Sequence, residues 1–498
     1  MKIPPLCLLY LVLFVPTAHA ARPQETGDGW YRQGEDTLKQ MLAQKPVSSK
    51  ARNVILFLGD GMGVTTVTAA RILAGQLKGG TGEENVLEFE RFPNVALIKT
   101  YTTNQQVPDS AGTMSAIMTG VKTLDGVLSV DQEIVRGDCA SAQGHGRTTL
   151  LEQFEQSGRA TGIISTARIT HATPAATYAH VPERDWESDA DVPAAATRAG
   201  CLDIARQLIE FPHGDGIDVI FGGGRAAFLP IAQPDPEYPA ERGLRRDGRN
   251  LINEWQQRHP EGRYLWNGID FANLDAQKAT RVLGLFQPSH MQFATDRERD
   301  PGTEPALADL TAAAIRILER NPNGFFLMVE GGRIDHALHG TNAWRALTDT
   351  AAFSDAVAKA VELTQAEDTM IIVTADHSHV LTLAGYPTRG NPILGKVVEN
   401  DNAGRPQSAP SLADDGKPYT TLGFASGPGA VVPRRDLQNT DTTAPDFKQD
   451  VFVPLESETH GGEDVAAYAR GPWAHLVRGV QEQNYLYHVM RYAAQLPP

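Results

Sequence analysis

Runs of consecutive apolar residues that stop at glycine constrain the fold of this 498-residue chain more than any other feature. The first run, residues 54–58 (VILFL), ends at the glycine-rich segment 59–63 (GDGMG). An uninterrupted apolar run bounded by glycine indicates a strand buried on both faces. The same pattern recurs at residues 95–98, 161–166, 219–221, 325–329 and 370–374.

Helix-like segments separate these runs, for example at residues 307–319 and 345–365. Strands that alternate with helices predict an α/β fold, here a three-layer sandwich with a large, mostly parallel central sheet. Ligands of such sheets bind beyond the carboxyl ends of the strands, so functional side chains are expected directly after each run. Residues 387–454 break the alternation and are rich in Pro, Gly, Asn and Asp, which indicates an inserted surface subdomain.

The charge balance limits the classes of partner. The chain has 60 Asp and Glu against 45 Lys and Arg, a net charge of −15. Nucleic-acid-binding domains usually carry a basic patch, so this balance argues against nucleic-acid binding. An acidic ligand would need a local positive site instead.

The first twenty residues have the features of a signal peptide. Lys2 precedes an apolar stretch at 6–15, and Ala18-His19-Ala20 forms a small-x-small cleavage signal. A membrane anchor is the weaker alternative, because the apolar stretch is far shorter than the roughly 20 residues of a spanning helix. Residues 490–498 lack the hydrophobic tail of a lipid-anchor signal. We therefore expect a periplasmic or secreted protein without a membrane anchor, cleaved near Ala20. An N-terminal arm at 21–50 follows, with an amphipathic helix at 30–44.

Two cysteines remain after cleavage. Cys7 leaves with the signal peptide, so Cys139 and Cys201 form a single pair in an oxidising compartment. A disulfide is expected there, and two buried free thiols are the alternative. A zinc site made of cysteines is excluded, because two distant sulfurs are too few.

Polar side chains follow the predicted strands one after another. Each has an ordinary explanation by itself, since DG turns are common and most histidines are not ligands. Several carboxylates at one sheet edge, however, would repel one another unless divalent cations neutralised them. The sequence thus predicts a metal centre from these residues: Asp60, Asp109, Ser110, His171, Thr173, Glu330, Asp335, His339, Asp376, His377 and His460.

The donor types suggest which metals bind. Asp335 and His339 stand four residues apart, on one face of a helical turn, and offer oxygen and nitrogen donors that suit zinc. Asp376 and His377 offer a second mixed set. A third set offers only oxygen, which suits magnesium: Asp60, Thr173 and Glu330. Two metals about 4 Å apart are a common device for in-line displacement at phosphorus.

Ser110 lies in a loop that runs into an apolar helical stretch, residues 108–118 (PDSAGTMSAIM). A helix N-terminus favours an anion through its free N–H groups and dipole. The alternative is an ordinary serine N-cap. A metal that lowers the hydroxyl pKa would make a Ser-His-Asp triad unnecessary.

Six motifs in order carry a resemblance to the alkaline phosphatase family. They cover about residues 28–492 and are more similar to the animal enzymes than to the short bacterial type. The motifs are NVILFLGDGMG (53–63), PDSAGTMSA (108–116), THATPAATYAH (170–180), GFFLMVEGGRIDHALH (324–339), VTADHSHV (373–380) and ETHGGEDVAAYARGPWAHLVRGVQEQ (458–483).

The resemblance implies a phosphomonoesterase of broad substrate range that works through a phosphoserine at a centre of two zinc ions and one magnesium ion. Ser110 is the implied nucleophile. One zinc is implied on Asp335, His339 and His460, and the second on Asp60, Asp376, His377 and Ser110. The implied magnesium ligands are Asp60, Thr173 and Glu330.

The resemblance also implies the substrate-binding residues. Arg184 matches the arginine that grips phosphate, because a guanidinium binds two oxygens at once. Without the family match, it would pass as a solvated loop charge. Asp109, His171 and His336 are implied to bind substrate as well. The two histidines replace a carboxylate and a lysine of the short bacterial type, and we expect them to act through water rather than as ligands.

Larger features follow from the same resemblance. Cys139 and Cys201 match a family disulfide, and residues 387–454 match a crown insertion at a dimer interface. The catalytic domain then comprises 51–386 and 455–498. A homodimer is implied, with the N-terminal arm and the insertion at the interface.

One departure concerns a calcium site of the animal enzymes. Glu237 and the carbonyl of Phe286 match its ligands, and Glu304 stands for an aspartate. Gln287 replaces a glutamate, and losing a carboxylate weakens a site for a hard cation. The sequence therefore leaves calcium occupancy open.

Three other functions fit less well. A sulfatase needs Cys or Ser in a C/S-x-P-x-R context, which Ser110 lacks. A phosphodiesterase usually lacks the third metal set, whereas Thr173 and Glu330 are present. A catalytically silent binding protein would be expected to have lost Ser110 or a zinc ligand.

Overall fold

The computed structural model describes residues 29–429 and 433–497, which fall into two units divided between Lys45 and Pro46. In the first unit, helix α1 (Gly29–Ala43) is amphipathic and has no buried residue. The predicted signal peptide lies outside the described residues.

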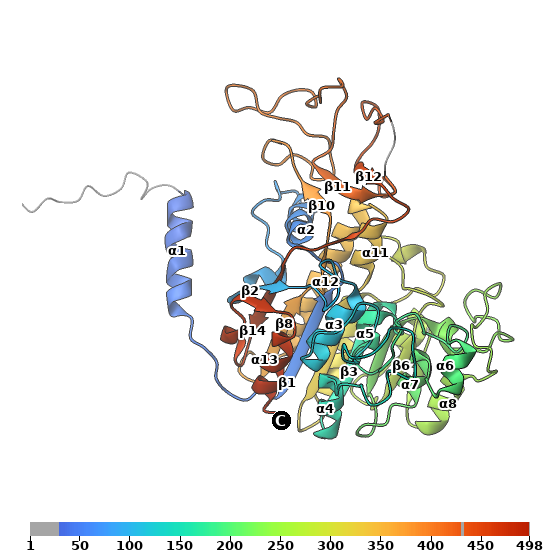
Figure 1. Ribbon diagram of the computed structural model, residues 1–498. Helices are drawn as coiled ribbons and strands as arrows, with labels where there is room; N and C mark the ends of the chain where they lie inside the picture. The colour runs from blue at the N-terminus through green and yellow to red at the C-terminus, as the bar shows by residue number, and fades with distance from the viewer. Residues whose placement is uncertain (1–28, 430–432, 498) are drawn as a thin grey trace, which may run out of the picture. The chain divides into compact units, whose positions relative to one another are not determined.

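The second unit is built on a ten-stranded sheet (Figure 1). Within the described chain, β14 is antiparallel to both of its neighbours, and the other strand pairs of this sheet are parallel. Across the sheet the order is β15 (Gly479–Glu482), β2 (Asn94–Lys99), β14 (Val465–Arg470), β8 (Thr369–Thr374), β1 (Asn53–Gly59), β7 (Phe325–Gly331), β3 (Ala160–Arg168), β4 (Val219–Gly223), β6 (Val282–Leu285) and β5 (Arg263–Leu265).

All six apolar runs form strands of this sheet. Every residue of β1, β7 and β8 is buried, as continuous apolarity predicts. β2 differs, because Val95 and Leu97 are exposed near the edge of the sheet. Four strands had no signal in the sequence analysis. β5, β6 and β15 are only three or four residues long, and β14 alternates buried and half-buried residues.

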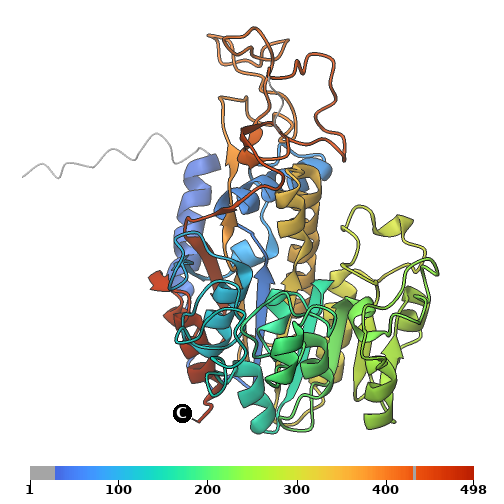
Figure 2. The same ribbon diagram turned by 45° about the vertical axis from the view of Figure 1, so that its right-hand side comes forward.

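Helices cover both faces of the sheet, which confirms the three-layer sandwich (Figures 1 and 2). One layer contains α2 (Val64–Leu77), α10 (Leu307–Leu318) and α12 (Ala343–Leu363), and the other contains α3 (Ser110–Thr119), α4 (Leu150–Gln156) and α13 (Tyr485–Ala494). The remaining helices are α5 (Ala172–Ala175), α6 (Ala194–Arg198), α7 (Ile204–Ile209), α8 (Leu251–Arg258), α9 (Gly268–Ala272) and α11 (Arg333–His339). Among the helices that are described, none has both the length and the apolar character needed to cross a bilayer.

Residues 387–429 and 433–454 form mostly loops and supply two strands of a separate three-stranded sheet (Figure 2). In it, β11 (Leu422–Gly427) lies between β10 (Leu381–Leu383) and β12 (Val451–Pro454). Beside it, β9 (Ser378–His379) pairs with β13 (His460–Gly461). This small pairing returns the chain after the insertion to the carboxyl end of β8.

Candidate metal centre and active site

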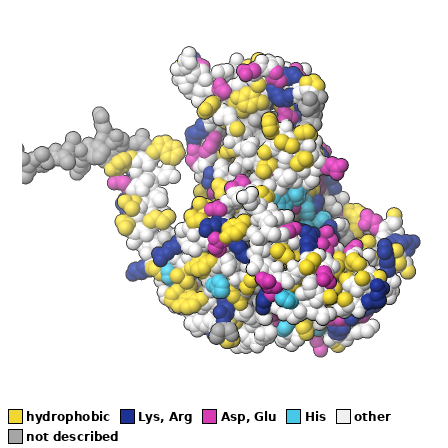
Figure 3. Space-filling view, in the orientation of Figure 1, with side chains coloured by type: hydrophobic (Ala, Val, Ile, Leu, Met, Phe, Trp, Pro, Cys, Tyr) yellow, Lys and Arg dark blue, Asp and Glu magenta, His cyan; other side chains and the backbone are white. Residues whose placement is uncertain are grey.

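The register of three central strands brings acidic residues to one edge of the sheet. Leu58 of β1 pairs with Glu330 of β7 on one side and with Thr374 of β8 on the other. Asp60 and Asp376 follow two residues later, and they and Glu330 are fully buried. Figure 3 shows histidine side chains gathered at the surface between the segment that carries β10–β12 and helices α3 and α5. The predicted convergence of polar residues is therefore present.

The first candidate metal-ligand set contains Asp335, His339 and His460. The Nε2 atoms of the two histidines are 3.2 Å apart and lie 3.4 and 3.5 Å from Asp335 Oδ1. Their Nδ1 atoms donate to backbone carbonyls, His339 to Glu458 (2.6 Å) and His460 to Pro108 (2.7 Å). Both Nε2 lone pairs therefore face one shared space, which is the arrangement of imidazoles that ligate a metal.

The second set contains Asp60, Asp376 and His377. His377 Nε2 lies 3.5 Å from Asp60 Oδ1 and 3.2 Å from Asp376 Oδ2. These two carboxylate oxygens are buried without a hydrogen-bond partner. Ser110 Oγ is 3.1 Å from the same His377 nitrogen, so the predicted nucleophile borders this set.

The third set offers oxygen atoms. Thr173 donates its hydroxyl to Asp60 Oδ2 (3.4 Å), and Glu330 accepts from the Ser165 hydroxyl through one oxygen. The other oxygen of Glu330 is buried without a partner. His171 joins Asp60 and Glu330 with ligand atoms within 4.8 Å of one another.

The electrostatics of this centre favour neutralisation of its carboxylates. Burial, followed by the charges of Asp376 and Asp335, raises the pKa of Asp60 well above its usual value. Burial likewise raises the pKa of Glu330 to about 8 and increases the pKa of Asp376. Divalent cations would neutralise these carboxylates and satisfy the orphaned oxygens, so the residues present fit a multinuclear metal site.

Ser110 begins helix α3 but does not cap it. Asp109 is the N-cap, and its Oδ1 accepts the Gly112 N–H (3.1 Å). The ordinary role proposed as the alternative for Ser110 is thus taken by its neighbour. The Ser110 hydroxyl is free to point at the metal-ligand sets, at the N-terminus of a helix.

Arg184 and two histidines border the same space. Arg184 Nη1 donates to Asp109 Oδ2 (2.9 Å), and Nη2 lies 3.3 Å from His171 Nε2. Burial lowers the pKa of His336 to about 3 and that of His171 well below its usual value. The rings of His336 and His290 lie close together, with centroids 4.0 Å apart and planes tilted by 56°. Neutral imidazoles therefore lie beside the arginine.

Sequence reasoning missed three residues here: His290, His379 and Glu458. His379 stands between Asp335 and Glu458, with a carboxylate at each ring nitrogen. Burial opposes its protonation, but hydrogen bonds to those two carboxylates outweigh burial and raise its pKa to about 10. The motifs at 373–380 and 458–483 contain His379 and Glu458, but nothing local distinguishes them from their neighbours.

Cys139 and Cys201 are joined by a disulfide, with Cα atoms 5.9 Å apart. The alternative of two free thiols is therefore excluded in this structure. The bond lies in a small apolar cluster with Trp186, Val192 and Ala196.

In this structure, N–H donors contact two carboxylates at the residues that match the calcium site, whereas Glu304 Oε2 is buried without a hydrogen-bond partner. Gln287 Nε2 donates to Asp300 Oδ1 (2.5 Å), while Glu237 accepts N–H groups of Arg225 (3.0 Å) and Gly302 (2.9 Å). These N–H donors compete with a cation for the carboxylate oxygens of Glu237 and Asp300. Asp300, which sequence reasoning missed, is the carboxylate that meets Gln287, and Glu304 donates its backbone N–H to Asp300 (3.0 Å).

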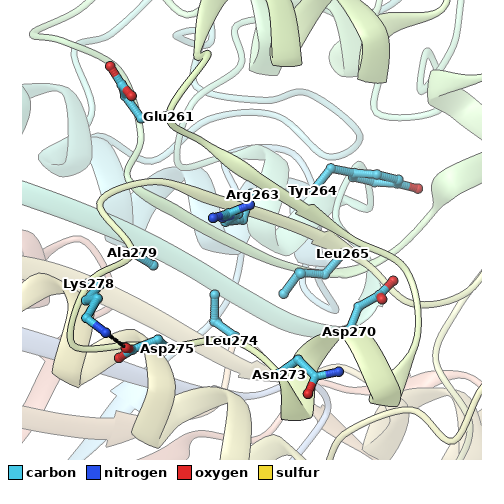
Figure 4. Close-up of a pocket in the computed structure, with 10 residues that line it drawn as sticks. All are labelled: Glu261, Arg263, Tyr264, Leu265, Asp270, Asn273, Leu274, Asp275, Lys278 and Ala279. Atoms are coloured by element: carbon cyan, nitrogen blue, oxygen red, sulfur yellow. Dashed lines mark ion pairs between the residues drawn. The ribbon is translucent and has the colours of Figure 1, made fainter.

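A separate hollow of about 550 Å³ lies beside β5 and α9 (Figure 4). Lys278 in its wall is paired with Asp275 (2.7 Å). The lining contains no histidine, cysteine or serine, so it lacks the nucleophile and mixed ligands of the metal centre. The lining residues are Glu261, Arg263, Tyr264, Leu265, Asp270, Asn273, Leu274, Asp275, Lys278 and Ala279.

Comparison with known proteins identifies the family. The family model "Alkaline phosphatase" matches residues 51–496. The chain is 45% identical over 480 residues to the tissue-nonspecific alkaline phosphatase of Gallus gallus, covering 94% of this chain and 89% of that protein. It is 46% identical over 476 residues to an alkaline phosphatase of Gadus morhua, covering 93% and 96%.

Solved structures agree at the level of fold. Thermus thermophilus alkaline phosphatase superposes with a TM-score of 0.64 at 23% identity, covering 92% of this chain and 94% of that one. The alkaline phosphatase from the Antarctic bacterium TAB5 superposes with a TM-score of 0.60 at 19% identity, covering 91% of this chain and 100% of that one. The chain belongs to the alkaline phosphatase family, a family of metal-dependent enzymes, and is a phosphoric monoester hydrolase.

Proposed function

We propose that this protein hydrolyses phosphate monoesters to an alcohol and inorganic phosphate through a phosphoserine at Ser110. The observation that carries the proposal is the position of the Ser110 hydroxyl. It starts α3, is not used as a cap, and lies 3.1 Å from His377 Nε2 at the edge of the metal-ligand sets.

We propose two zinc ions and one magnesium ion as cofactors. The mixed nitrogen and oxygen sets suit zinc, and the oxygen set suits magnesium. When bound, these cations stabilise negative charge on the attacking, leaving and non-bridging oxygens. The proposed zinc ligands are Asp335, His339 and His460 for one ion and Asp60, Asp376, His377 and Ser110 for the other. The proposed magnesium ligands are Asp60, Thr173 and Glu330.

The protein's own groups then carry out two displacements. The Ser110 oxygen attacks phosphorus in line and releases its proton to water, while the bond to the leaving oxygen breaks and that oxygen takes a proton from water to become the alcohol. In the second step a water oxygen attacks phosphorus, the bond to Ser110 breaks and Ser110 regains a proton, so the configuration at phosphorus is retained. Arg184 binds two phosphoryl oxygens through its planar fork, and Asp109 holds the guanidinium in place. The free N–H groups at the start of α3 favour the same anion.

The substitution Ser110→Ala tests the covalent route. Activity with p-nitrophenyl phosphate should fall by several orders of magnitude, as in other knockouts of a nucleophile. Zinc and magnesium content should stay near wild type, because the other ligands are intact. The same change at exposed Ser289 serves as the control.

A trapping experiment identifies the phosphorylated residue. With labelled phosphate at acidic pH, where the second step slows because water is harder to deprotonate, label should accumulate on Ser110. Near wild-type turnover by Ser110→Ala, or label on another residue, would refute the mechanism.

We also propose that the protein is exported after cleavage near Ala20 and forms a homodimer through α1 and residues 387–454. Leu38, Met41 and Leu42 of α1 are exposed, which favours a partner surface for that helix. Phosphate monoesters are the proposed substrates, and neither nucleic-acid binding nor a membrane anchor is part of the proposal.

A further inference from the structure

We propose that Glu458 is a positioning residue that fixes the ligands of one zinc ion from outside its coordination shell. The inference rests on the proposed function, because it assumes zinc on Asp335, His339 and His460. Glu458 is 2% exposed and lies two residues before His460, and its backbone and side chain reach the other two ligands by separate routes.

The side-chain route passes through His379. Glu458 Oε1 accepts the Val380 N–H (2.7 Å), and Oε2 accepts the hydrogen bond of His379 Nδ1. At the other side of the ring, His379 Nε2 donates to Asp335 Oδ1 (2.6 Å). This is the same oxygen that faces His339 and His460, so the orientation of the His379 ring determines where that ligand oxygen lies.

The ring itself has no room to move toward β1. Gly61, with φ of +67°, lies directly against it, and a Cβ at this position would be 2.4 Å from His379 Cδ2 and 3.3 Å from Asp335 Oδ1. The second glycine of the GDGMG segment therefore serves both a left-handed turn and the close approach of backbone to this imidazole.

The backbone route holds His339. Its Nδ1 donates to the Glu458 carbonyl (2.6 Å), and its own carbonyl accepts the Glu458 N–H (3.0 Å). The first contact fixes the tautomer that leaves Nε2 for the metal. Gly427 of β11 supports Glu458 from behind, because a Cβ there would lie 3.0 Å from Glu458 Cβ.

Carboxylates and carbonyls that orient metal ligands contribute to metal affinity, and substituting them typically lowers that affinity about 10- to 100-fold. In Glu458→Gln the amide keeps one acceptor but replaces the other with a donor. The Val380 N–H and the His379 Nδ1–H both donate, so one of them meets an N–H group instead of an oxygen. The backbone contacts to His339 remain, which limits the change to the His379 route.

The test measures zinc release rather than activity. Zinc-loaded wild type, Glu458→Gln and the control Glu456→Gln are titrated with a chelator, and released zinc is followed with a metal-sensitive dye. Glu456 is exposed on the same segment, so the control makes the same change of charge. We expect one of the two zinc ions of Glu458→Gln to bind about 10- to 100-fold more weakly. Wild-type affinity for both ions in Glu458→Gln would overturn the inference.

A second variant keeps the inference testable if Glu458→Gln folds poorly. His379→Asn breaks the route at its middle and should weaken the same zinc ion. In the double variant Glu458→Gln/His379→Asn, the loss of zinc affinity should be smaller than the sum of the two single losses, because both substitutions break the same chain of contacts. Full additivity would also overturn the inference. If wild type itself bound no zinc, the proposed function would fail instead, so the two failures are distinguishable.

Discussion

Asp109→Asn tests how the arginine beside the nucleophile is held. The Asp109 carboxylate accepts three N–H groups, from Gly112 (3.1 Å), Gly126 (3.0 Å) and Arg184 (2.9 Å). Burial opposes its ionisation, but Arg184 and the two backbone N–H groups outweigh burial and lower its pKa. Asparagine caps helices about as well as aspartate, so α3 should be preserved. The amide nitrogen, however, cannot accept a hydrogen bond.

Asp109 Oδ2 accepts two N–H groups, from Gly126 and Arg184, and the size of the effect on activity follows from the loss of the Arg184 bond. A hydrogen bond to a charged group contributes about 1.5–3 kcal/mol. If that energy positions Arg184 in the transition state, kcat/KM should fall roughly 10- to 150-fold, at about 1.4 kcal/mol per tenfold change. Binding of inorganic phosphate should weaken as well, because the guanidinium binds the same oxygens in the product.

The assay compares kcat and KM for p-nitrophenyl phosphate, and inhibition by phosphate, in four proteins: wild type, Asp109→Asn, Arg184→Ala and the double variant. In the Arg184→Ala background, adding Asp109→Asn should lower kcat/KM only slightly, because the residue that Asp109 positions is already absent. Asp185→Asn is the control, since this exposed carboxylate is adjacent in sequence. Wild-type kcat/KM for Asp109→Asn, or fully additive losses, would refute the reasoning.

Replacing Cys139 and Cys201 by serine should lower the free energy of unfolding by about 4 kcal/mol on the chain-entropy model, given a sequence separation of 62; an unchanged melting temperature would contradict this. Glu155 is buried, and burial followed by the charges of Asp218 and Asp215 raises its pKa to about 8. Because the folded pKa lies above the unfolded value of about 4.3, its contribution to stability falls as pH rises between the two. At pH 9 the free energy of unfolding of Glu155→Gln should therefore exceed that of wild type by on the order of 1–3 kcal/mol, and near pH 4 the two values should match. Thermal denaturation at both pH values measures the difference. Sedimentation should find an active dimer that dissociates when residues 29–43 are deleted; a fully active wild-type monomer would refute the dimer.

The sequence by itself was sufficient for the central strands and for the cluster of polar residues that follow them. Strands buried on both faces need continuous apolar residues, so the local sequence is enough to predict β1, β7 and β8. The carboxyl ends of parallel strands lie at the same edge of a sheet, so the sequence alone predicts that the residues directly after these strands lie close together. The family resemblance added a role for Arg184, which no periodicity singles out.

Tertiary structure decided what depends on partners far apart in the chain. The antiparallel direction of β14 is set by pairing with β2 and β8, not by its own six residues. His379 acquires its place from Glu458, 79 residues away, and from Asp335, 44 residues away. Likewise, Asp300 rather than Glu304 is the carboxylate that accepts the Gln287 amide. Side-chain hydrogen bonds of this kind produce no periodic pattern in the sequence, because each needs only one donor residue and one acceptor residue. The tertiary fold determines which two residues come together.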